Sequence, residues 1–94
     1  MEPAVQLRTN SWQARYALAE ELGFSEQNEE ALLQLQEVVK LKPDHAAAHL
    51  NLGVALFKLR RVDEAKAEFG EVLRLNPQNK TARDYLDQLG TAPR

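Results

Sequence analysis

Cysteine is absent from this chain of 94 residues. Without thiols, neither a disulfide framework nor a thiolate metal site can form. Aromatic residues make up only 6% of the sequence, and no apolar run approaches the roughly 20 residues needed to span a bilayer. The first ten residues also lack the basic start and apolar stretch of a signal peptide. These absences predict a soluble, cytoplasmic protein with no membrane partner.

A large excess of charge of either sign is also missing. The chain has 12 basic and 14 acidic side chains, for a formal net charge of −2. Non-specific binding to nucleic acid depends on clustered lysine and arginine that neutralise phosphates. Because the basic residues here are dispersed among glutamates, we expect no nucleic-acid partner. One small cluster, Lys58 with Arg60 and Arg61, is expected in a solvated turn, where an acidic partner could touch it.

What the sequence does contain is an internal repeat of 34 residues. Residues 12–45 and 46–79 carry the same residue at nine positions, where average composition would give roughly two or three. The register continues into the C-terminal segment, because Ala48 pairs with Ala82 and Leu52 with Leu86. A period of this length is typical of stacked helix–turn–helix units.

Helical periodicity accompanies the repeat, and no segment alternates as a strand does. The apolar stripes and their flanking signals predict five helices, over about 11–23, 29–42, 45–59, 63–74 and 80–89. Gly23 and Gly90 are expected to end helices, and Asp44 and Asn79 to cap them. Short turns make neighbouring helices pack as antiparallel hairpins. The prediction is an all-α domain over residues 11–90, with a flexible lead-in at 1–10 and a loose tail at 91–94.

The second unit resembles a tetratricopeptide repeat, through Leu52-Gly53, Ala65, Phe69 and Pro77 at the spacing of that family, with Asn51 and Val72 also acceptable. The first unit resembles it more loosely, through Leu18-Ala19, Ala31, Leu35, Val38 and Pro43. Residues 80–89 resemble the capping helix that closes such arrays. The resemblance implies an α-solenoid with one repeat at 12–45, a second at 46–79 and a fifth, capping helix at 80–89.

Small residues stand where the helices of each hairpin are expected to cross. They are Ala19 with Ala31 in the first unit and Gly53 with Ala65 in the second. A larger side chain there would push the helices apart, at a cost of about 1–3 kcal/mol.

The chain departs from the family pattern at four positions. Arg15 and His49 stand where a bulky aromatic is usual, and Glu26 and Arg60 stand where the turn usually has glycine. These departures weaken the match of the first repeat more than that of the second.

The resemblance implies a concave face, lined by the first helix of each hairpin, that binds an extended peptide or a partner helix. The predicted groove residues are Gln13, Tyr16, Glu20, Phe24, Ala47, Leu50, Val54, Phe57, Lys58, Thr81, Asp84 and Gln88. Leu50, Val54 and Phe57 form an apolar ridge at i, i+4 and i+7. Either this ridge binds a partner, or it packs under the N-terminal segment or against the fifth helix. We expect an apolar centre with charged residues at the rim, namely Glu20, Lys58 and Asp84.

One specialised use of the family, the grip of a C-terminal carboxylate by lysine, asparagine and arginine, is not expected. The corresponding positions hold Tyr16, Glu20, Asn51, Thr81 and Tyr85. Only Asn51 agrees with that pattern, and Glu20 would repel a carboxylate.

Catalysis and metal binding have little support. His45 and His49 are four residues apart, which is metal-ligand spacing, but no third ligand is evident beyond Asp44. A helix-cap role for His45 and a core-edge position for His49 are the expected readings. Ser11 and Ser25 fall at helix boundaries, where capping explains them. We therefore expect no enzyme, no metal and no cofactor.

The sequence as a whole predicts a protein–protein interaction adaptor that binds a partner's peptide or helix in the concave groove. The alternative is a self-assembling homodimer that covers the same apolar face, because two repeats are few for a fold stabilised by stacking neighbours. A small enzyme or metal protein is the least supported reading.

Overall fold

The computed structural model describes residues 11–90 of the chain. Within that range the chain forms five α-helices and no strand, so the all-α prediction is confirmed. The helices are α2 (Trp12–Phe24), α3 (Asn28–Leu41), α4 (Ala46–Lys58), α5 (Val62–Leu75) and α6 (Lys80–Leu89). The lead-in expected at 1–10 and the tail expected at 91–94 lie outside the described residues. None of the five helices has the length and hydrophobicity of a bilayer-spanning segment.

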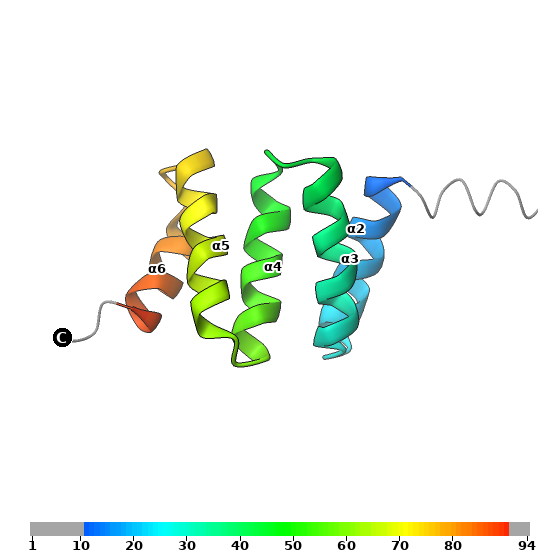
Figure 1. Cartoon of the computed structure of the whole chain (residues 1–94), viewed down its shortest axis with the longest axis horizontal. Helices are drawn as coiled ribbons and strands as arrows, with labels where there is room; N and C mark the ends of the chain where they lie inside the picture. The colour runs from blue at the N-terminus through cyan, green and yellow to red at the C-terminus, as the bar shows by residue number, and fades with distance from the viewer. Residues whose placement is uncertain (1–10, 91–94) are drawn as a thin grey trace, which may run out of the picture.

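The helices stack in the order in which they occur in the sequence. Contacts join α2 to α3, α3 to α4, α4 to α5 and α5 to α6, and Figure 1 shows this order across the molecule. Short turns reverse the chain between neighbours, which makes each successive pair antiparallel. The arrangement is therefore a helical-repeat solenoid, with no centre around which all five helices gather.

The helices α2, α4 and α6 begin with the same capping contact, at intervals of 34 residues. A side-chain acceptor takes the N–H that has no partner inside the helix. The pairs are Ser11 Oγ with Ala14 N at 3.1 Å, His45 Nδ1 with Ala48 N at 3.1 Å, and Asn79 Oδ1 with Ala82 N at 2.9 Å. The capping roles expected for Ser11, His45 and Asn79 are confirmed. Asp44 does not cap α4, because the neighbouring imidazole already accepts that N–H.

The turn inside each hairpin also repeats. α2 continues through Gly23 to Phe24, so the expectation that Gly23 ends this helix is wrong. The backbone enters the left-handed region at Glu26, with φ of 63°, and at Arg60, with φ of 68°. Glycine is favoured there because it has no Cβ to clash with the backbone. The two departures from the family's turn glycine therefore adopt the conformation that glycine would.

Small residues let the helices of each hairpin approach closely, as expected. Ala19, Ala31 and Ala65 are buried. A Cβ on Gly53 would lie only 2.7 Å from Cε1 of the buried Phe69 ring. Beyond that ring lies Tyr85 of α6, stacked on it with centroids 4.7 Å apart and an interplanar angle of 5°. The last helix therefore covers the core of the second hairpin.

Candidate functional site

A cleft of about 260 Å³ opens where α2, α3 and α4 meet. Its wall is made mainly of small and apolar residues, with polar and charged groups among them. The lining residues are Ala19, Glu20, Gly23, Phe24, Asn28, Ala31, Leu35, Asn51, Val54, Ala55 and Lys58. Short side chains at the helix crossing leave this volume unfilled, while Phe24 beside it is 89% exposed. The cleft therefore combines an apolar hollow with a large, solvent-exposed aromatic ring.

Four of the predicted groove residues line this cleft: Glu20, Phe24, Val54 and Lys58. Lys58 Nζ also lies 3.6 Å from Glu26 Oε2, which joins the end of α4 to the turn after α2. Both side chains are well exposed, so the ion pair contributes about 0–1 kcal/mol and can yield to another charged group.

Tyr16 lies beside the cleft and ties two helices together. Asn51 Nδ2 donates a hydrogen bond to Tyr16 Oη at 3.1 Å, from α4 to α2. Burial raises the pKa of the Tyr16 phenol above its ordinary value, and the nearby Glu20 carboxylate raises it further. The phenol thus stays protonated at neutral pH and holds the two inner helices in register.

The apolar ridge of α4 is divided between two environments. Leu50, Val54 and Phe57 are all half-buried and pack against the core. The Phe57 ring lies 5.4 Å from that of Tyr85 at an interplanar angle of 66°. Packing against the fifth helix, one of the predicted alternatives, is therefore found for Phe57. Of these three residues, Val54 is the one that lines the cleft.

The other predicted groove residues do not line the cleft. Five of them are exposed elsewhere on the first helices or on α6, namely Gln13, Ala47, Thr81, Asp84 and Gln88. Asp84 Oδ2 lies 3.1 Å from Lys80 Nζ, in an i, i+4 pair on α6. The three charged residues expected at one rim are thus separated, with Glu20 and Lys58 at the cleft and Asp84 on the last helix.

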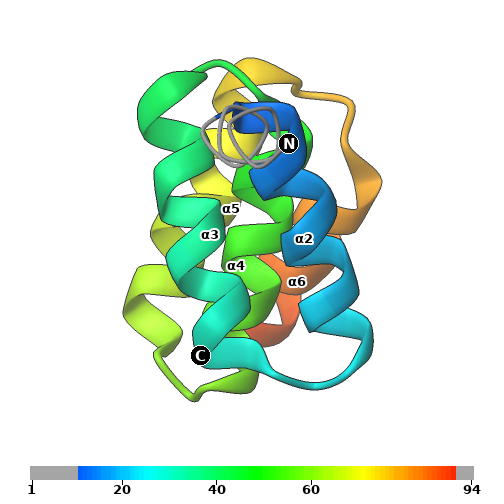
Figure 2. The same cartoon turned by 90° about the vertical axis from the view of Figure 1, so that its right-hand side faces the viewer.

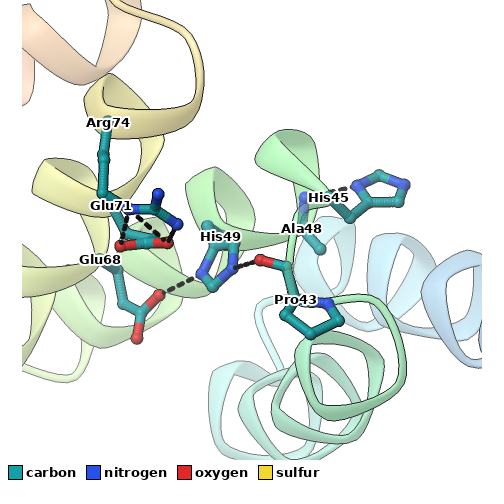
Figure 3. A network of polar contacts seen from close by, with 7 residues as sticks. All are labelled: Pro43, His45, Ala48, His49, Glu68, Glu71 and Arg74. Carbon is teal, nitrogen blue, oxygen red and sulfur yellow. Dashed lines mark hydrogen bonds and ion pairs between the residues drawn. The ribbon is translucent and has the colours of Figure 1, made fainter.

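The two histidines have separate structural roles. His45 caps α4, whereas His49 is 8% exposed, with Nδ1 2.7 Å from Glu68 Oε1 and Nε2 2.8 Å from the Pro43 carbonyl oxygen. Figure 3 shows the two rings apart, with the His49 ring between Glu68 and Pro43. Both readings expected for this pair are confirmed. Among residues 11–90, no group of three or more His, Cys, Asp or Glu side chains is placed to hold a metal ion.

Arg15 and His49, which stand where the family usually has an aromatic residue, make equivalent contacts in the two hairpins. In the first hairpin, Arg15 Nη1 donates to Gln34 Oε1 at 3.1 Å. In the second, His49 contacts Glu68, and each of these residues lies 34 positions after its counterpart. A polar bridge between the two helices of a hairpin therefore stands where the family usually has an aromatic.

The basic cluster of Lys58, Arg60 and Arg61 lies at the end of α4 and in the turn that follows, and all three residues are exposed, as expected. Arg61 Nε lies 2.7 Å from Glu64 Oε1. This hydrogen-bonded pair raises the pKa of Arg61 and lowers that of Glu64. Lys58 is engaged with Glu26.

Sequence reasoning missed most of the cleft wall. The sequence places Ala19 and Ala31 at a helix crossing and Leu35 in the family pattern, whereas Asn28 and Ala55 carry no signal of their own. The available signal was the pairing of small residues at the crossing. Small side chains permit close helix approach there, and they also leave space on the neighbouring surface.

The chain is similar to known proteins that contain helical repeats. The family model for the tetratricopeptide repeat matches residues 16–80. DnaJ homolog subfamily C member 3 of Homo sapiens is 39% identical over 59 residues, which are 63% of this chain and 12% of that protein. Protein STIP1 homolog of Dictyostelium discoideum is 34% identical over 62 residues, 66% of this chain and 11% of the relative. Heat shock protein STI1 of Saccharomyces cerevisiae is 35% identical over 60 residues, 64% of this chain and 10% of the relative.

These matches span about a tenth of the length of each relative. The serial hairpins, the 34-residue period and the match over residues 16–80 agree with one another. The chain belongs to the tetratricopeptide repeat family, whose helical modules bind other proteins.

Proposed function

We propose that this chain is a non-catalytic adaptor whose cleft between α2, α3 and α4 binds an extended peptide or a helix of a partner protein. The observation that carries the proposal is the exposed Phe24 ring beside an apolar hollow that contains Val54. Exposed apolar surface of this kind, framed by polar groups, is typical of interaction sites. A partner side chain placed there would remove both residues from water.

The size of the cleft favours a peptide over a small molecule. At about 260 Å³, it is smaller than the roughly 300–1,000 Å³ of sites that enclose drug-sized ligands. It can accept an apolar side chain while the rest of the partner runs along the surface. The other predicted groove residues, from Gln13 on α2 to Gln88 on α6, would extend that contact.

The charges at the cleft suggest what should flank the apolar anchor of the partner. Glu20 offers a carboxylate for a basic group, and Lys58 offers an ammonium that is held only by a weak surface pair with Glu26. We propose a partner segment with one apolar residue between groups of opposite charge. We also place the adaptor in the cytoplasm, because a chain without cysteine needs no oxidising compartment.

The first prediction concerns Val54→Glu, which puts a carboxylate into the apolar hollow. We expect partner capture to fall by about tenfold or more, since burying an unpaired charge is costly. Proteins retained from native lysate by the immobilised chain would be quantified by mass spectrometry. Val62→Glu is the matched control, because Val62 is also partly exposed but lies at the start of α5, away from the cleft.

Circular dichroism and thermal melting of both variants complete this experiment. Loss of the same partners from V54E but not from V62E, with both variants folded, supports the cleft. If V54E unfolds, Val54 is a core residue and the cleft assignment is wrong. Equal retention of partners by V54E and the unmodified chain would also overturn the proposal.

A further inference from the structure

The end of the solenoid formed by α2 and α3 carries exposed leucines away from the cleft. Leu18 is 43% exposed and Leu33 is 60% exposed, and neither lines the cleft. Figure 2 looks onto this end, with α2 and α3 nearest the viewer. Two large apolar side chains on one end of a small domain suggest a surface that something covers.

The repeat shows what kind of surface this end is. Adding 34 to Leu18, Leu22 and Leu33 leads to Leu52, Leu56 and Ala67. These three residues of the second hairpin line the seam where it meets Gln36 and Val39 of α3. Leu52 and Leu56 are each only 3% exposed, whereas Ala67, the counterpart of Leu33, remains exposed. The outer end therefore presents the surface that, one repeat later, stacks against a neighbouring hairpin.

The charges on this end distinguish it from an ordinary stacking surface. The buried His49 and Ala55 of α4 correspond to Arg15 and Glu21 of α2. These two charges lie three residues before and three residues after Leu18. Glu21 is exposed and has no salt bridge within residues 11–90. Arg15 uses one N–H for Gln34, out of the five that a guanidinium carries.

We propose that two copies of this chain associate through this end, with the two α2 helices antiparallel about a two-fold axis at Leu18. With such an axis, a residue that lies n positions before Leu18 in one copy is level with the residue n positions after Leu18 in the other copy. Arg15 of one copy is then level with Glu21 of the other, at about 4.5 Å along the helix from the centre. The two Leu18 side chains meet in the middle, and two Arg–Glu pairs flank them.

This arrangement of charge selects a second copy as the occupant. An isologous interface must be complementary to itself, and one basic and one acidic residue placed symmetrically about an apolar centre satisfy that condition. Because an isologous interface uses the same patch on both copies, two copies saturate it, and the association stops at a dimer without continuing into a filament.

The interface is distinct from the cleft, and it is small. Because α2 supplies most of it, the buried area falls at the low end for specific protein contacts, which is typical of weak association. The dimer is therefore expected to be weak, so that its population rises with protein concentration. The cleft of each copy stays open, so dimerisation and partner binding can be tested separately.

The experiment is sedimentation equilibrium of the full chain over a wide concentration range. We expect a monomer–dimer equilibrium that Leu18→Lys weakens by about tenfold or more. Glu21→Arg and Arg15→Glu should each weaken it as well, because each places like charges across the axis. The double variant R15E/E21R exchanges the charges and should restore dimerisation. Val54→Glu is the control and should leave the dimer unchanged.

Several results would overturn the proposal. If the chain remains monomeric at the highest concentration, a second copy does not cover this end and the proposal is wrong. A dimer that resists L18K, or that V54E dissociates, uses another face. If R15E/E21R dimerises no better than E21R, and circular dichroism shows that all variants are folded, the proposed pairing of Arg15 with Glu21 is wrong. Should Arg15→Glu unfold the chain by losing Gln34, E21R and L18K still decide the outcome.

Discussion

At the scale of single residues, Gly53 of α4 has the least room of the four glycines, because a Cβ there would lie 2.7 Å from the Phe69 ring of α5. The ring has no room to retreat, since it is fully buried and Tyr85 stacks on it. Protein interiors are close-packed, so even one added methyl group must displace a neighbour. The glycine is therefore needed here for its small size, and its freedom at positive φ plays no part.

Gly53→Ala should destabilise the fold by about 1–3 kcal/mol, because its Cβ would overlap the aromatic ring. Gly70→Ala is the matched control. Gly70 lies on the exposed side of α5, and nothing stands within 4 Å of a Cβ placed there. That change should stabilise the helix by roughly 0.5–1 kcal/mol. Urea unfolding would measure both, and a G53A variant as stable as G70A would mean that the ring moves freely.

At the scale of elements, the repeat reproduces the helix ends together with the core. The three caps and the two left-handed turn residues recur at the same spacing, although the side chains differ. The three cap residues share a side-chain acceptor that reaches the backbone N–H three residues later. The two turn residues share a left-handed backbone conformation. His45 serves this role with an imidazole, whose ring also contacts those of Trp12 and Tyr16.

Asn79 offers the cleanest test of the caps. Asn79→Ala removes the acceptor for Ala82 N and should cost about 1 kcal/mol, within the range of about 0.5–2 kcal/mol seen for cap deletions. Asn79→Asp keeps an acceptor and adds favourable charge at the helix start, so it should match or exceed the original stability. Chemical denaturation would compare the two, and equal losses for both variants would show that the cap contributes little.

At the scale of the whole molecule, the stability of each helix pair depends on its packing against the neighbouring elements of the stack. Each hairpin buries apolar surface between its own two helices and against the element next to it in the stack. The helix α6 covers the second hairpin, because its Tyr85 ring contacts both Phe69 and Phe57. Removing that cover should weaken the second hairpin as well as α6.

Tyr85→Ala is predicted to lower the free energy of unfolding by about 2–4 kcal/mol, since it uncovers one buried ring and one half-buried ring. Tyr85→Phe keeps both ring contacts and should change stability by less than about 0.5 kcal/mol. Thermal and urea unfolding would measure both variants. A small effect of Y85A would show that α6 is peripheral and that α5 is stable without it.

Much of the fold could be predicted from the sequence because helix periodicity and helix ends are local properties. The spacing of apolar residues, the small residues at Ala19 and Gly53, and the caps at Ser11 and Asn79 each depend on a few neighbours in the chain. The error at Gly23 has the same origin. A glycine near a helix end resembles a stop signal, but the chain reverses at Glu26, whose residue type gives no sign of a left-handed backbone.

Within residues 11–90, the amino-acid sequence by itself determined the number of helices, their pairing into hairpins and which side of each helix faces inward. Only the tertiary structure decided that Val54 lines an open cleft, whereas Phe57, one turn further on, packs against Tyr85. Periodicity assigns a residue to one side of its helix but not to the neighbour that covers it. Exposure depends on how far each neighbouring helix extends across that side, and this is set by packing between elements distant in the chain.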